Sequence, residues 1–259
     1  MTWTTRPRSD VNGLAVVTSG AGPRILLIHG VGLRAEAWNA QIADLSLHYE
    51  ILAPDLPGHS ASAALPGSAG LQDFGDCIAK LLDRPAVVVG HSMGAMIALD
   101  LANRYSGKVK GVVALNAIFK RSSAARAAVK ERAAALDGKS VSDPAATLAR
   151  WFGDAPSPER SACRDWLTSV DPPGYKAAYS VFAGEDGPDE NALRTLSCPA
   201  LFMTGSREEN STPEMSRAMA ALVPSGKAMV VEDAAHMMPM THPEEVNRAL
   251  LAFAKRCQE

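Results

Sequence analysis

Short hydrophobic runs alternate with longer stretches of helical periodicity through most of this 259-residue chain. The hydrophobic runs include residues 50–54, 86–90, 109–116, 199–205 and 227–233, and the helical stretches include residues 35–47, 71–83, 93–105, 212–222 and 243–256. Short apolar strands separated by helices are typical of a parallel sheet that helices cover on both faces. The pattern therefore predicts an α/β protein with a mostly parallel central sheet.

The first thirty residues depart from this alternation. An Asn-Gly pair in "DVNG" (residues 10–13) precedes two β-rich runs, "LAVVT" and "RILLIHG". Asn-Gly favours the tight turn of a hairpin. We therefore expect a hairpin around Asn12 and Gly13, followed by a further strand at residues 24–30.

Strand patterns are missing between residues 117 and 195. This stretch instead contains four short helical segments separated by Pro and Gly, at residues 122–136, 144–152, 158–170 and 173–184. We interpret it as a helical layer inserted into the sheet domain. The predicted organisation is a first part of the core at 1–116, a helical cap insertion at 117–195 and a second part of the core at 196–259.

Charge and cysteine content exclude several classes of function. The formal net charge is -2, and no polybasic tract attracts a phosphate backbone, so we expect no nucleic-acid partner. No apolar run has the length of a bilayer span, and the first residues lack the apolar centre of a secretory signal, so we expect a cytoplasmic protein without a membrane partner. The four cysteines are scattered and form no CxxC pair, which argues against a zinc site.

The sequence "GHSMG" (residues 90–94) places a serine between two glycines, after a predicted strand and before a predicted helix. In this context a G-x-S-x-G motif indicates a sharp turn that exposes a nucleophilic serine. Gly90 and Gly94 are needed because side chains there would collide with neighbouring chain. A serine that only caps a helix is the alternative reading of Ser92.

Several motifs together resemble the α/β-hydrolase family, in order and spacing. They are "LLIHGVG", "DLPGHSAS", "GHSMG", "MTGSREENSTPEM" and "AAHMMPMTHPEEVN". The resemblance spans nearly the whole chain and is weakest across the insertion, which in that family is a variable cap over the active site. It implies the α/β-hydrolase fold and catalysis by a serine, a histidine and an acid in that chain order.

The chain order leaves two candidates for the general base, His236 and His242. His242 precedes Pro243 at the start of the last helix, where a capping or surface role suits it better. We therefore assign the base to His236. We expect the three remaining loop histidines near the same cleft to hydrogen-bond loop backbone; they are His29, His59 and His91.

The resemblance places the acid in the loop after residues 199–205. Relatives commonly carry aspartate in a G-x-x-D arrangement, and counting from Gly205 the same position here is Glu208. The neighbouring Glu209 takes the role if the loop is shifted by one residue. Glu232 and Asp233 lie too close in sequence to His236 and are interpreted as solvated charges at a strand end.

The resemblance also assigns the oxyanion hole to two backbone N–H groups. One belongs to Met93, the residue after the nucleophile, and the other to Val31, which follows the "HG" pair. We expect apolar residues of the cap and of the His236 loop to line the substrate pocket, among them Trp151, Tyr179 and Met237.

These residues predict a serine hydrolase that cleaves a carboxylic ester or related acyl compound through an acyl-enzyme on Ser92. The substrate is expected to be a small, partly apolar molecule, and no metal or organic cofactor is required. A lactonase, a carbon-carbon bond hydrolase or a perhydrolase could use the same triad, and a small-molecule receptor of the same fold is the alternative from another class. Neither the oligomeric state nor the physiological substrate follows from these residues.

Overall fold

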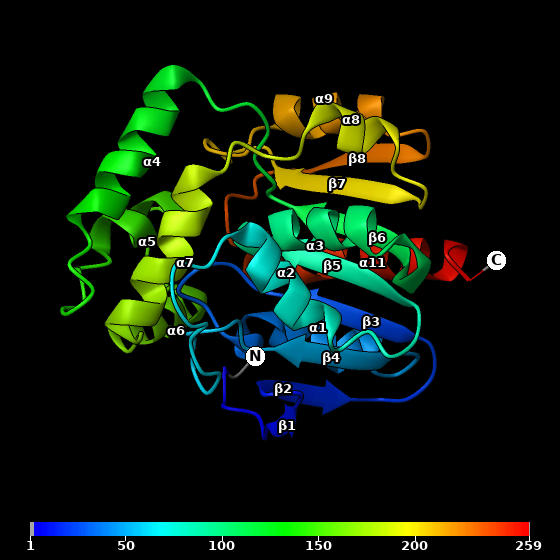
Figure 1. Cartoon of the computed structure of the whole chain (residues 1–259), viewed down its shortest axis with the longest axis horizontal. Coiled ribbons are helices and arrows are strands. Elements are labelled where there is room, and N and C mark those ends of the chain that lie inside the picture. Colours follow the sequence, from blue (N-terminus) through cyan, green and yellow to red (C-terminus); the bar gives the residue numbers. More distant parts are fainter. Residues whose placement is uncertain (1–2, 259) are drawn as a thin grey trace.

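An eight-stranded sheet runs through the middle of the computed structural model, which describes residues 3–258 (Figure 1). The strands lie in the order β1-β2-β4-β3-β5-β6-β7-β8. All neighbours from β4 to β8 are parallel, and only β1 and β2 run antiparallel to their neighbours. The strands are β1 (Ser9–Val11), β2 (Leu14–Ser19), β3 (Arg24–Ile28), β4 (Glu50–Pro54), β5 (Ala86–His91), β6 (Val109–Leu115), β7 (Ala200–Gly205) and β8 (Gly226–Val231).

The first two strands form the hairpin expected from the Asn-Gly pair. Val11 pairs with Leu14, and the two residues between them, Asn12 and Gly13, have φ values of 56° and 85°. Two consecutive positive φ values are what a two-residue hairpin turn of this hand requires, and Asn and Gly tolerate them best.

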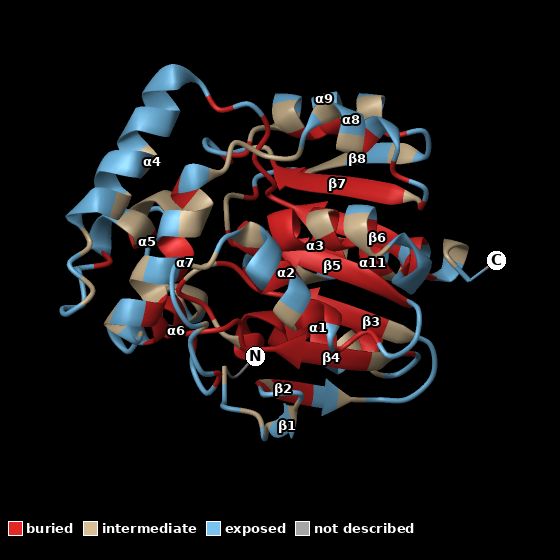
Figure 2. Ribbon diagram, viewed as in Figure 1, coloured by how far each residue is buried: buried red, intermediate tan, exposed pale blue. Residues whose placement is uncertain are grey.

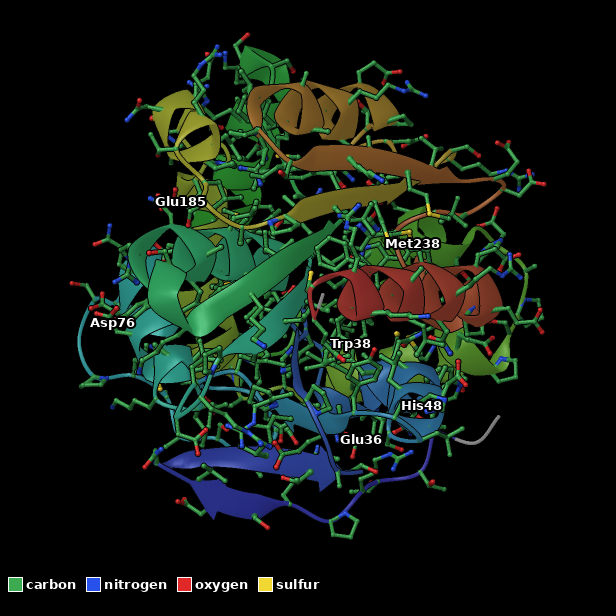
Figure 3. All side chains as sticks on the ribbon, turned by 90° about the vertical axis from the view of Figure 1, so that its right-hand side faces the viewer. Glu36, Trp38, His48, Asp76, Glu185 and Met238 are labelled. Atoms are coloured by element: carbon green, nitrogen blue, oxygen red, sulfur yellow. The ribbon has the colours of Figure 1, made fainter. Side chains whose placement is uncertain are left out.

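Helices cover both faces of the sheet, as the alternating pattern predicts. Side chains of β3 alternate between the two layers: Leu26 and Ile28 pack with the helices of one face, Ile25 and Leu27 with those of the other. The first face carries α2 (Leu71–Ala79), α3 (Met93–Arg104), α8 (Glu190–Arg194) and α9 (Pro213–Leu222). The second carries η1 (Ala35–Trp38), α1 (Asn39–Leu45), α10 (Met238–Thr241) and α11 (Pro243–Arg256), with Trp38 and Met238 in its core (Figure 3).

Four helices gather beyond one end of the sheet (Figure 1). They are α4 (Ser123–Ala135), α5 (Ala145–Phe152), α6 (Pro158–Thr168) and α7 (Pro172–Gly184). Helix α4 buries none of its residues and is the most exposed of the four (Figure 2). Helix α8 also lies within the range 117–195 but packs beside α9 on the core. The boundaries of the cap stay a prediction.

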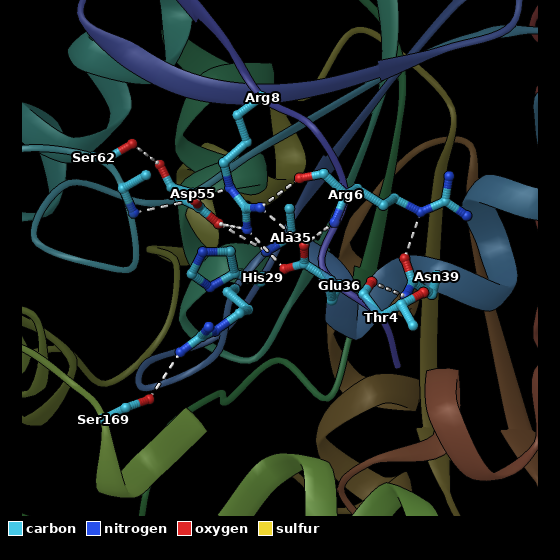
Figure 4. Close-up of polar contacts among 12 residues, drawn as sticks. Thr4, Arg6, Arg8, His29, Ala35, Glu36, Asn39, Asp55, Ser62 and Ser169 are labelled. Atoms are coloured by element: carbon cyan, nitrogen blue, oxygen red, sulfur yellow. Dashed lines mark hydrogen bonds and ion pairs between the residues drawn. The ribbon is translucent and has the colours of Figure 1, made fainter. Parts of the chain in front are cut away.

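A buried ionic cluster fixes the N-terminal segment to the core (Figure 4). The Arg8 guanidinium donates to Glu36 Oε2 at 2.7 Å and to Asp55 Oδ2 at 2.5 Å. Both carboxylates are buried, with at most 1% of either residue exposed. Asp55 follows β4, and it also accepts a hydrogen bond from the Ala35 N–H at 3.0 Å. The cluster therefore holds together the loops that follow β3 and β4.

The element boundaries differ from the sequence expectation in one instructive place. Helix α2 ends at Ala79 instead of continuing to residue 83. Leu81 and Leu82 are buried, but their N–H groups bond to the carbonyl oxygens of Ile78 and Ala79, three residues back, in a tight turn and not in a continued α-helix.

Among the described helices, none combines the length and the hydrophobicity that crossing a bilayer requires.

Candidate active site

Ser92 occupies a sharp turn between β5 and α3. Its φ of 57° and ψ of -118° are strained for a residue with a side chain. A Cβ at Gly90 would overlap the Gly94 carbonyl, and a Cβ at Gly94 would overlap the Ile28 carbonyl. Gly90 therefore allows the start of α3 to lie against β5, and Gly94 allows it to lie against the end of β3, as the motif predicts.

Glu208 and His236 meet at the carboxyl end of the sheet. His236 Nδ1 donates to Glu208 Oε2 at 2.7 Å, and only 2% of the Glu208 side chain is exposed. The other carboxylate oxygen, Oε1, accepts hydrogen bonds from the N–H groups of Asn210 at 2.8 Å and Ser211 at 3.3 Å. Burial opposes ionisation of Glu208, but the nearby His236 and these hydrogen bonds outweigh it and lower its pKa to about 2. The carboxylate is therefore charged throughout the physiological pH range.

The other acidic candidates lie elsewhere. Glu209 is exposed, and no hydrogen bond joins it to His236 within the described part of the chain. Asp233 and Glu232 are also exposed; Asp233 pairs with Arg207, and Glu232 accepts from the Ser206 hydroxyl at 3.1 Å. Of the acids considered from the sequence, Glu208 alone contacts the ring of His236 among residues 3–258.

Three residues hold His236 in place. The Nε2–H of His91 and the side-chain amide of Asn116 both donate to the His236 carbonyl oxygen, at 2.8 Å and 2.6 Å. The Trp151 ring of α5 stacks on the imidazole, with centroids 5.3 Å apart and an interplanar angle of 23°. Burial, and then the charge of His236, lower the pKa of His91 to about 3, so His91 stays neutral. One cap helix thus contacts the imidazole directly.

Ser92 and His236 line one cavity between the sheet and the cap. Because Glu208 binds Nδ1 of His236, the Nε2 atom of the ring remains available to a nucleophile. Within the described residues no direct hydrogen bond joins the Ser92 hydroxyl to His236. Contacts between nucleophile and base are often long before substrate binds. Trp151 and Tyr179, both expected in the pocket, belong to the cavity wall.

Met237 lies elsewhere than the sequence suggested. It is 1% exposed and packs in a separate apolar cluster with Trp166 and Leu148, which joins cap to core. The residue does not belong to the cavity wall. Successive side chains of the loop diverge, so proximity to His236 in sequence does not bring Met237 to the substrate side.

The backbone groups expected to form an oxyanion hole flank the nucleophile. Val31 lies in the cavity wall beside Gly30 and Ser92. Met93 is the first residue of α3, where an N–H group has no partner within its own helix. The loop that carries Val31 is held by His59, whose Nε2 accepts from the Gly32 N–H at 3.0 Å.

The buried loop histidines make the backbone contacts expected of them. His29 Nε2 accepts from the Leu56 N–H at 2.9 Å, and His59 Nδ1 donates to the Pro57 carbonyl at 3.1 Å. His242 is half-buried at the N-terminus of α11, where its Nδ1 contacts the Thr241 hydroxyl at 2.8 Å and the structure records no side-chain cap bond for it. His29 and His59 thus position loops. Of the histidines considered from the sequence, His236 belongs to the cavity wall.

Sequence reasoning missed several residues of the cavity wall. Asn116 directly follows β6, and the end of a parallel strand is a signal that could have identified it. Three arginines of the wall could not be recognised from sequence, because charged residues on helices and in connecting segments are usually solvated. They are Arg121, Arg132 and Arg150.

Comparisons with known proteins show which family and which relatives the chain resembles. The sequence pattern of the Alpha/beta hydrolase family matches residues 25–249. The chain is 41% identical over 240 residues to (E)-2-((N-methylformamido)methylene)succinate hydrolase of Acinetobacter baylyi, covering 90% of this chain and 91% of that protein. It is 31% identical to the pimeloyl-[acyl-carrier protein] methyl ester esterase of Chromobacterium violaceum, covering 92% and 96%.

A solved structure gives the same result for the fold. A thermophilic esterase from Thermogutta terrifontis, with malate bound, superposes with a TM-score of 0.85 at 27% identity, covering 98% of each chain. The likeness includes the cap helices as well as the sheet, since almost the whole of both chains is aligned.

Proposed function

Since the chain belongs to the α/β-hydrolase family, we propose that Ser92, His236 and Glu208 are the catalytic triad with which it hydrolyses its acyl substrate. The relatives named above are hydrolases, which confirms the sequence prediction of a hydrolase for a small acyl compound. The assignment of the three residues rests on the contact between His236 and Glu208 in the wall of the cavity that contains Ser92.

The reaction would proceed in two halves. Ser92 Oγ attacks the substrate carbonyl carbon while His236 Nε2 takes its proton, and Glu208 stabilises the imidazolium from the Nδ1 side. The N–H groups of Val31 and Met93 would stabilise the oxyanion of the tetrahedral intermediate. His236 then returns the proton to the leaving group, and an acyl-enzyme remains. Water activated by His236 attacks that ester, which releases the acid and restores Ser92.

The cavity supports a substrate with a partly apolar body. Leu33, Ile118 and Phe182 contribute apolar wall next to the proposed nucleophile, and Trp151 closes the side of His236. We propose cleavage of a carboxylic ester as the general activity. Cleavage of a C–N bond in a carboxylated amide is the second candidate, because the relative of 41% identity is named for a succinate that carries an N-methylformamido group.

A fluorophosphonate probe tests the nucleophile. We expect the wild-type protein to be labelled and Ser92→Ala to lose both the label and esterase activity, the latter by about 10⁴-fold or more. Ser68→Ala, at an exposed loop position, is the matched control and should label like wild type. Labelling that persists in Ser92→Ala, or a wild-type protein that ignores the probe and binds small molecules without turnover, would refute the proposal.

A substrate panel separates the activities that share this triad. It contains 4-nitrophenyl esters, lactones, vinylogous diketones and N-acyl enamides of dicarboxylic acids. Perhydrolysis is measured by adding peroxide to the ester assay. We expect turnover of esters or enamides that is lost in Ser92→Ala. If only the diketones are turned over, the proposed activity is wrong and the protein is a carbon-carbon bond hydrolase.

A further inference from the structure

The residues that line the catalytic cavity carry an excess of positive charge. Three arginines belong to it, and no aspartate or glutamate does among the described residues. Guanidinium groups in a confined space repel one another unless an anion lies between them. Each of the three therefore needs either acceptor groups of the protein or a bound anion.

Arg121 is committed to the structure. Its guanidinium donates to the carbonyl oxygens of Phe182 and Glu185, lies 4.5 Å from the centre of the Phe182 ring and is 3.9 Å from Asp186. These contacts tie the segment after β6 to the end of α7. Arg121 thus has little capacity left for a ligand.

Arg150 and Arg132 differ from it. Within residues 3–258 the Arg150 guanidinium has no hydrogen bond and no ion pair, and its Nε is buried without a partner. Arg132 donates to the Tyr179 hydroxyl at 3.1 Å and pairs with no carboxylate of the described chain. The two arginines line the same two neighbouring cavities, and burial, followed by the charge of Arg132, lowers the pKa of Arg150.

Arginines elsewhere in this chain show how such charges are usually satisfied. Arg8 lies between Glu36 and Asp55, and Arg104 lies between Asp76 and Asp100. An arginine on a cap helix could also simply be solvated. That reading accounts for the exposure of Arg132, but it leaves unexplained why the Arg150 Nε is buried and why both residues line the cavity that contains Ser92.

We propose that Arg132 of α4 and Arg150 of α5 form an anion subsite that binds a carboxylate group of the substrate, away from the carbonyl that Ser92 attacks. The subsite rests on the proposed function, because it positions an acyl compound for that serine. A carboxylate between two guanidinium groups would accept charge-assisted hydrogen bonds from both and offset their mutual repulsion. The substrate class is then an ester or amide that carries a free carboxylate, such as a half-ester of a short dicarboxylic acid.

Charge-matched substrates test the subsite. Mono-4-nitrophenyl esters of succinic, glutaric and adipic acid are compared with the same compounds whose free acid is a methyl ester. For the best chain length, wild type should favour the anionic substrate by at least about 10-fold in kcat/KM. Arg150→Met and Arg132→Met should each lower kcat/KM for the anionic substrate by about 10- to 100-fold, mainly through KM, and change the methyl ester less than about threefold. Arg150→Lys should recover part of the preference.

The control is Lys130→Met, which removes an exposed cation from the same helix as Arg132 but not from the cavity wall. It should leave the preference unchanged, which separates a local contact from a general loss of positive charge. Equal kcat/KM for anionic and methylated substrates in wild type, or equal losses for both in Arg150→Met, would overturn the subsite.

Binding measured without turnover keeps this result separate from the triad. Calorimetry with Ser92→Ala should detect glutarate or succinate, and the double variant Ser92→Ala/Arg150→Met should lose at least about 10-fold in affinity. If neither esters nor enamides are cleaved but this difference is found, the triad assignment fails and the anion subsite holds. If esters are cleaved by Ser92 and dicarboxylates bind equally to both variants, the subsite fails and the triad assignment holds.

Discussion

Glu208 uses both of its carboxylate oxygens, and this explains how glutamate can occupy a position where the family resemblance led us to expect aspartate. Oε2 accepts from the imidazole, while Oε1 accepts from two backbone N–H groups of its own loop. The loop N–H groups fix the longer side chain, so its extra methylene does not loosen the contact with His236. At the same time they stabilise the charged form, which keeps its pKa near 2.

Exchanging the acid tests this arrangement. Glu208→Gln removes the charge that stabilises the imidazolium and permits the wrong ring tautomer, so we expect kcat to fall by about 10³- to 10⁴-fold, by analogy with the same type of exchange in protease triads. Glu209→Gln, one residue along and exposed, should change kcat less than about twofold. Steady-state kinetics on a 4-nitrophenyl ester measures both. If the two variants lose activity equally, Glu208 is not the acid.

Sequence alone predicted the three residues that we propose as the triad. Ser92 was predicted from its flanking glycines, whereas chain order for His236 and spacing after Gly205 for Glu208 had meaning only through the resemblance to the α/β-hydrolase family. Arg150 could not be found this way, because a charge on a cap helix is normally solvated and its lack of a partner is a three-dimensional property. Met237 was misplaced for the same reason: adjacency in sequence does not determine which way a side chain points.

At the scale of elements, the strand-turn-helix unit β5-Ser92-α3 shows how tightly packing constrains one helix. Gly94 is in the first turn of α3, directly against the backbone that leaves β3. Helix propensity alone favours alanine over glycine there, by about 1 kcal/mol. The overlap with the Ile28 carbonyl opposes that preference, and it involves backbone atoms that cannot move aside cheaply.

We therefore expect Gly94→Ala to lower the free energy of unfolding by about 1–3 kcal/mol, the usual cost of overpacking. Gly184→Ala is the matched control, since it is also a helical glycine but has open space around its Cβ position. It should leave stability within about 0.5 kcal/mol or raise it slightly. Urea denaturation of both variants measures the difference, and a Gly94→Ala protein as stable as wild type would contradict the packing argument.

The sequence predicted strands better than helix ends. Inner strands of the parallel sheet such as β5 and β7 are continuous apolar runs that are buried along their whole length, which makes them easy to recognise in the sequence. Helix α2 was expected to reach residue 83 because Leu81 and Leu82 continue the apolar periodicity. A tight turn after Ala79 buries these two leucines as well as a longer helix would. The hydrophobic pattern therefore cannot distinguish a continued helix from a turn.

At the scale of the whole molecule, neutral histidines support the loops around the site from inside. Burial comes first among the causes that lower the pKa values of His29 and His91 to about 3, followed by the charge of a neighbouring histidine. The pKa of His59 is also lowered, mainly by burial. Each ring hydrogen-bonds loop backbone in its neutral form.

These histidines predict that the fold loses stability in mild acid. Their folded pKa values lie below the unfolded value of 6.5, so the unfolded chain binds protons that the folded chain does not. As pH falls from about 6.5 towards 5, the free energy of unfolding should decrease with a slope that approaches about 1.4 kcal/mol per pH unit for each such histidine. The carboxylates with lowered pKa values, Glu208 among them, contribute only below about pH 4.5, their ordinary range.

Urea denaturation between pH 7.5 and 5 measures this slope. His48→Gln replaces an exposed histidine (Figure 3) and should keep the wild-type slope, whereas His91→Gln should give a shallower one whatever its stability at pH 7.5. The difference in slope counts the proton that His91 excludes when folded, independently of the hydrogen bond to His236 that the variant also loses. If the free energy of unfolding of the wild type is constant from pH 7 to 5, the buried histidines become protonated in the folded state without cost. The loops around Ser92 would then not depend on neutral histidines.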